Sequence, residues 1–138
     1  MKITASGPPV LPAGTLLALA RRGLVEACTV ATPGERYATA HLAALRVAAA
    51  VLACRARPGR RTRPTSAWVL LADVAPELAE WAAFFAAGAR KRAAAEAGLP
   101  SAVTVREADD LVRDAQAFLT MVESSLGLPG QQLLLASG

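Results

Sequence analysis

The sequence has one histidine, His41, which follows Arg36 by five positions in an R-x4-H spacing. An imidazole with a pKa near ~6.5 can take a proton from a ribose 2′-hydroxyl at neutral pH. A guanidinium can hold a phosphate and offset the charge that develops on it. Arg36 and His41 are therefore candidate catalytic residues for RNA scission without a metal. On one regular helix they would lie about 140° apart, so a structural histidine beside a surface arginine is the alternative.

A cluster of five arginines is the second candidate site, for nucleic-acid binding. Its members are Arg55, Arg57, Arg60, Arg61 and Arg63. Proline and glycine lie between them, which predicts a loop. Such a loop can clamp phosphates, with a steep dependence of binding on salt, or it can be a solvated connector. No aromatic residue interrupts the loop, so base stacking is not indicated.

The composition narrows the class of protein. The chain has 138 residues, a length typical of one domain, and it is 54% hydrophobic, which excludes a disordered chain. Its net charge is +4, and thirteen of its fifteen basic residues are arginine. The two cysteines, Cys28 and Cys54, form no CxxC motif, and we expect buried free thiols. Neither a metal site nor a cofactor is expected.

Residues 3–20 carry no charge, but they do not have the pattern of a targeting segment. Pro8, Pro9 and Pro12 interrupt them, and no stretch offers the roughly 20 apolar residues of a membrane span. We therefore expect a cytoplasmic protein with no membrane partner. Residues 1–14 are predicted to form a flexible arm and residues 128–138 a tail.

Start and stop signals divide residues 15–127 into helices. Helices are predicted over residues 15–30, 33–56, 67–74, 76–97 and 105–126. Thr32 and Ser66 are expected N-caps, and Thr104 with Glu107 forms a capping box. The core centre is expected to hold Trp68, Trp81, Phe84 and Phe85. The fold class is all-α, an up-down bundle of four to five helices.

Four segments resemble HEPN domains of the SAV_6107-like actinobacterial branch, namely residues 35–46, 66–72, 76–85 and 106–115. The resemblance spans about residues 16–126. It implies a four-to-five-helix bundle that is usually a homodimer. Many HEPN proteins are metal-independent RNases of toxin–antitoxin or defence systems, and others bind RNA, nucleotides or partner proteins without catalysis. The family motif is an arginine with a histidine four to six positions later, which Arg36 and His41 match in spacing.

Three functions follow as hypotheses. The first is an RNA-associated or regulatory binding module, in a toxin–antitoxin or stress-response system, with RNA or a protein as partner. The second is a metal-independent endoribonuclease that uses Arg36 and His41. The third is a structural protein-interaction module with no nucleic-acid role.

Overall fold

The computed structural model describes residues 11–55 and 66–127, and these ranges contain helices but no strand. The elements are α1 (Ala13–Ala27), α2 (Pro33–Arg55), α3 (Ala67–Val74), the 3-10 turn η1 (Pro76–Leu78), α4 (Ala79–Ala87), α5 (Ala89–Glu96) and α6 (Val105–Leu126). The predicted all-α class is confirmed. Helix α1 begins two residues before the predicted start, and Pro12 occupies its N-cap position.

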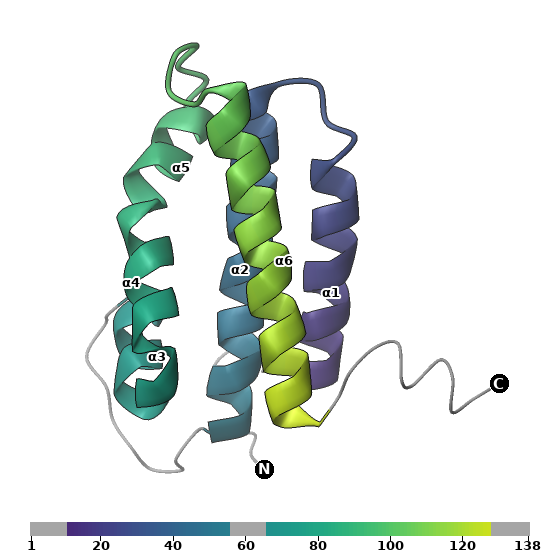
Figure 1. Ribbon diagram of the computed structural model, residues 1–138, viewed down its shortest axis with the longest axis vertical. Helices are drawn as coiled ribbons and strands as arrows, with labels where there is room; N and C mark the ends of the chain where they lie inside the picture. The colour runs from purple at the N-terminus through teal and green to yellow at the C-terminus, as the bar shows by residue number, and fades with distance from the viewer. Residues whose placement is uncertain (1–10, 56–65, 128–138) are drawn as a thin grey trace, which may run out of the picture.

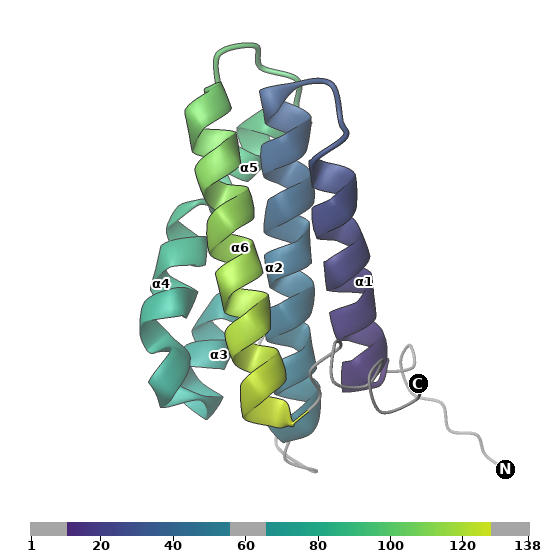
Figure 2. The same cartoon turned by 45° about the vertical axis from the view of Figure 1, so that its right-hand side comes forward.

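The helices form an up-down bundle of four rods (Figure 1). Helices α1, α2 and α6 run side by side, and the fourth rod is made of α4 followed by α5. The short α3 lies beside α4 at the end of the bundle away from the connection between α5 and α6. The view turned by 45° (Figure 2) shows α2 between α1 and α6.

Helix α2 occupies the centre because most of its circumference is apolar and small. Its buried alanines, Ala40, Ala43 and Ala44 among them, let neighbouring backbones approach closely. At the crossing with α1, a Cβ placed on Gly23 would lie 3.4 Å from the Cβ of Ala43. This tight contact leaves little room for a larger residue at either position.

By length and mean hydropathy (1.5), α2 also meets the criteria for a membrane span. Half of that apolar window is buried against the other helices. The central helix of a soluble bundle has the same composition, so this is weak evidence for a membrane segment.

Helix starts follow the predicted caps. The hydroxyl of Thr32 accepts a hydrogen bond from the Glu35 amide at 3.1 Å, and the Ser66 hydroxyl accepts one from the Val69 amide. Thr104 and Glu107 form both bonds of the capping box. These local signals set the register of the apolar faces.

One helix was predicted over residues 76–97, and this prediction is wrong. The segment begins with η1, and Gly88 separates α4 from α5. Gly88 packs closely against α2, since a Cβ on it would lie 2.5 Å from the hydroxyl of Tyr37. The sequence pattern reports helix propensity but not this contact from another helix.

Stacked aromatic rings fill the core between α3, α4 and α6. The ring of Phe85 lies 5.3 Å from that of Trp68 and 5.2 Å from that of Phe118, centroid to centroid. Trp81 stacks on Phe118 at 5.2 Å but remains half-buried. Phe84, which was expected in the core, is 46% exposed instead, because it lies on the outer side of α4.

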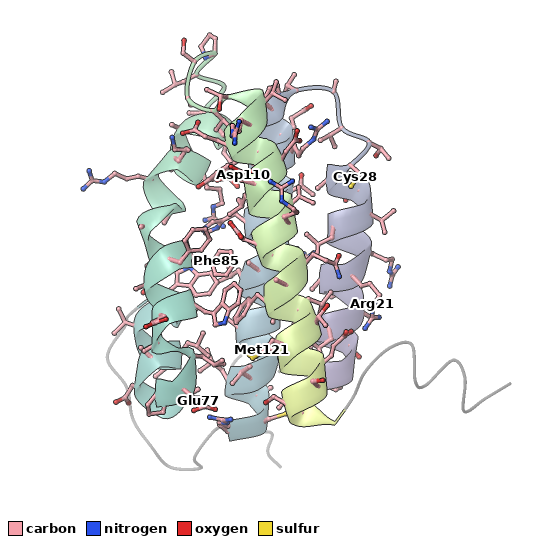
Figure 3. The ribbon with its side chains drawn as sticks, in the orientation of Figure 1. Arg21, Cys28, Glu77, Phe85, Asp110 and Met121 are labelled. Atoms are coloured by element: carbon pink, nitrogen blue, oxygen red, sulfur yellow. The ribbon has the colours of Figure 1, made fainter. Side chains whose placement is uncertain are left out.

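The two cysteines also differ from the prediction. Cys28 and Cys54 are free thiols, as expected, but both are exposed. Each lies at the end of a helix, where the apolar stripe no longer faces a partner. Figure 3 shows Cys28 beside the connection between α1 and α2.

Candidate functional site

His41 is sealed inside the bundle. Its side chain is 1% exposed, and it is the only buried polar residue in the ranges that the structure describes. Its Nε2 lies 2.8 Å from the carbonyl oxygen of Phe85, in the last turn of α4. Because a carbonyl only accepts, Nε2–H is the donor, and the lone pair of the neutral imidazole lies on Nδ1.

Aromatic rings enclose the imidazole. The ring planes of Trp68 and Phe85 meet it edge to face at 5.9 and 6.2 Å, and Tyr37 stacks parallel to it at 6.3 Å. Phe85 points from α4 into this interior (Figure 3). A substrate phosphate therefore has no path to His41 within one folded chain.

Burial lowers the pKa of His41. The hydrogen bond to the Phe85 carbonyl opposes this effect, the nearby Arg92 cation adds to it, and Glu96 opposes it weakly. The imidazole is thus neutral at physiological pH. Its Nδ1 and the Nε of Arg92 are the two buried side-chain polar atoms that have no hydrogen-bond partner among the described residues.

Arg36 has a structural role where α1, α2 and α6 meet. Its Nε donates to the carbonyl of Ala27 at the end of α1 (3.1 Å), and its Nη1 donates to Asp109 of α6 (2.5 Å). One guanidinium therefore satisfies a free helix carbonyl and joins α1, α2 and α6. Arg36 contacts α1 and α6, whereas His41 contacts α4, so the two candidate residues do not meet within one chain.

Of the arginine cluster, the structure describes only Arg55. Its guanidinium pairs with Glu77 at 2.6 Å and donates to the carbonyl of Val74 at 3.3 Å, which ties the end of α2 to η1. The other four members lie outside the described residues. They are Arg57, Arg60, Arg61 and Arg63.

The helices carry less positive charge than the whole chain does. Ten of the fifteen basic residues and all eleven acidic residues lie in the described ranges, so these have a formal charge of −1. Seven of the ten basic side chains there form ion pairs. The remaining three are Arg22, Arg46 and Arg90. The excess positive charge thus belongs to Lys2 and the four arginines of residues 57–63.

A hollow of about 760 Å³ lies where the α1–α2 and α5–α6 connections meet. Its charged lining is acidic and consists of Glu26, Glu35 and Glu96. Within the described residues, no group of three or more histidine, cysteine or acidic side chains is placed to hold a metal ion.

A smaller hollow of about 320 Å³ lies between α4 and α6. Two aromatic side chains, Trp81 and Phe84, and two carboxylates, Glu80 and Asp114, line it. This group could not be predicted from the sequence. The sequence pattern placed the two aromatic residues in the core, and only the pairing of α4 with α6 brings Asp114 to them.

The fold and the enclosed histidine define a small all-α bundle in which an R-x4-H pair has structural roles. The family model described as SAV_6107-like HEPN matches residues 27–123, and the chain belongs to this HEPN family. No curated protein and no solved structure gives a significant match to it.

Proposed function

We propose that this chain is a non-catalytic HEPN binding module, a soluble cytoplasmic protein of a toxin–antitoxin or stress-response system. The observation that carries the proposal is the burial of His41, whose Nε2–H bonds to a main-chain carbonyl. A general base must come within hydrogen-bond reach of the proton that it removes. The only histidine of the chain fails this condition, which argues against the endoribonuclease alternative.

The test is an RNA-cleavage assay with the purified full-length protein in chelator. We expect no cleavage above that of a buffer control across structured and single-stranded RNAs. Cleavage that persists through purification and disappears in a folded Arg36→Gln variant would overturn the proposal, because it would require the pair to act together, for example across a homodimer.

RNA association through residues 57–63 is the finer part of the proposal. The uneven charge distribution supports it, since four arginines fall in seven residues while the described helices have a formal charge of −1. Each phosphate contact releases counterions, so log K should fall with log[salt] with a slope near −0.7 per contact for single strands.

A triple variant of Arg57, Arg60 and Arg61 to glutamine should weaken RNA binding and reduce this slope by about 2. The matched control removes the same charge from the helices, at Arg22, Arg46 and Arg90, which form no ion pair within the described ranges. Fluorescence anisotropy with a labelled single-stranded RNA measures both variants. Equal losses of RNA affinity in the two variants would show only a general effect of charge. The structural protein-interaction module would then be the remaining hypothesis.

The homodimer is also part of the proposal, because it rests on the HEPN family. Light scattering of the full-length protein over a range of concentrations tests it. A mass that stays at that of one chain would remove the dimer.

A further inference from the structure

Unpaired carboxylates concentrate at the two hollows. Asp73 has an interaction of its own, and of the other acidic residues those that form no ion pair within the described ranges are Glu26, Glu35, Glu80 and Asp114. The first two line the larger hollow, and the last two line the hollow between α4 and α6. Only the second hollow combines its carboxylates with aromatic rings, so it has the more specific chemistry.

The aromatic rings of this hollow are held by the core. Trp81 stacks on Phe118 at 5.2 Å and on Phe85 at 6.0 Å, so its indole has a fixed orientation. Phe84 meets Phe85 edge to face at 5.0 Å and is 46% exposed. Exposed rings that are fixed in advance can receive a ligand with little further loss of conformational entropy.

Neither carboxylate pairs with a basic side chain of the residues that the structure describes. Asp114 is half-buried, and burial raises its pKa, as does the charge of Asp110 one turn earlier. The charge of Arg113 lowers this pKa to a smaller extent, and its guanidinium forms an ion pair with Asp110 rather than with Asp114. Glu80 lies in the first turn of α4, on the other side of the hollow. A cation between Glu80 and Asp114 would relieve this unfavourable charge.

We propose that this hollow binds the guanidinium group of an arginine side chain presented by a partner protein. A planar guanidinium can stack on an aromatic face and donate to carboxylates at its edge. The volume of about 320 Å³ is at the lower limit for small-molecule pockets and suits a single long side chain. The proposal is independent of RNA association, which requires a surface of opposite charge.

The probe is N-acetyl-arginine amide, titrated into the isotope-labelled full-length protein. We expect saturable NMR shifts of the Trp81 indole N–H and of the Asp114 and Phe84 amides. The buried Trp68 indole, at 5% exposure, is the internal reference. N-acetyl-citrulline amide has nearly the same shape without the charge, and it should shift none of these signals. Equal shifts with both compounds would overturn the proposal.

Variants that keep side-chain shape locate the site. Asp114→Asn and Glu80→Gln should each weaken binding of the arginine probe about two- to fivefold. Glu35→Gln, an unpaired carboxylate of the other hollow, is the matched control and should change nothing. Circular dichroism checks that each variant is folded. Unchanged binding in both folded pocket variants would overturn the proposal.

A second copy of this chain is a different occupant with a distinct signature. The Trp81 signals would then shift with protein concentration before any probe is added. If Phe84→Ala abolishes such shifts, the hollow is a self-association surface and not a site for a partner's arginine. That result would overturn the proposal.

Discussion

His41 joins α2 to the place where α4 ends. The Phe85 carbonyl in the last turn of α4 accepts from the Gly88 amide at 3.0 Å, and the imidazole supplies a second donor to it. Residue type and spacing could not separate this role from catalysis, because a neutral imidazole can serve in either, as a donor through its N–H or as a base through its other nitrogen. Burial separates them, and burial depends on helices that lie more than forty residues away in the sequence.

The lowered pKa of His41 predicts a loss of stability in mild acid. The unfolded chain gains a proton as the pH falls below about 6.5, and the folded chain resists protonation, so acid favours unfolding. Between pH 7.5 and 5.5 the free energy of unfolding should fall by up to about 1.4 kcal/mol. Above pH 7.5 the imidazole should add no pH dependence.

Urea denaturation at the two pH values measures this loss. The control is His41→Gln, whose amide can still donate to the Phe85 carbonyl but does not titrate. Its unfolding free energy should be nearly constant over this pH range, although Arg92, Glu96 and Tyr37 still surround the position. An equal pH dependence in both proteins would contradict the assignment.

At the scale of the element, sequence signals that act within one helix predicted the structure best. The caps at Thr32, Ser66 and Thr104 and the stop at Gly127 involve neighbours a few residues apart. The break at Gly88 was not predicted, and Gly88 is in close contact with Tyr37, which lies on another helix. The exposure of Phe84 was missed for a similar reason, since periodicity does not say which stripe of an apolar helix faces a partner.

The same break predicts a coupled pair of substitutions. Gly88→Ala should lower the free energy of unfolding by about 1–3 kcal/mol, because the new Cβ would overlap the hydroxyl of Tyr37. Tyr37→Phe removes that hydroxyl, so the double variant should recover much of the loss. Thermal or urea unfolding of the four proteins gives the coupling energy. Additive losses would mean that the hydroxyl is not the cause.

At the scale of the whole molecule, the net charge of +4 is unevenly distributed along the chain. The described helices are nearly neutral, with a formal charge of −1, and the basic excess lies in residues outside them. Composition alone suggested a basic protein. The ion pairs that join the helices, such as Arg21 with Glu123 and Lys91 with Glu107, show that much of the basic charge is used within the fold.

The aromatic core lies between α2, α3, α4 and α6, and two neighbouring phenylalanines test which face of α4 is buried in it. Phe85 is 0% exposed and contacts rings from three elements, so Phe85→Ala should cost about 3–5 kcal/mol. Phe84→Ala, on the outer side, should cost about 1 kcal/mol or less. Urea denaturation compares them, with Phe85→Leu as a milder variant if Phe85→Ala does not fold. Similar costs at both positions would contradict the assigned faces.

The exposed thiols Cys28 and Cys54 have a practical consequence for solution work. In air, accessible thiols on separate molecules can oxidise to an intermolecular disulfide. A purified sample kept without reductant can therefore contain covalent pairs whose mass equals that of a natural dimer. Keeping a phosphine reductant in every buffer, or replacing both cysteines with serine, separates cross-linking from true association.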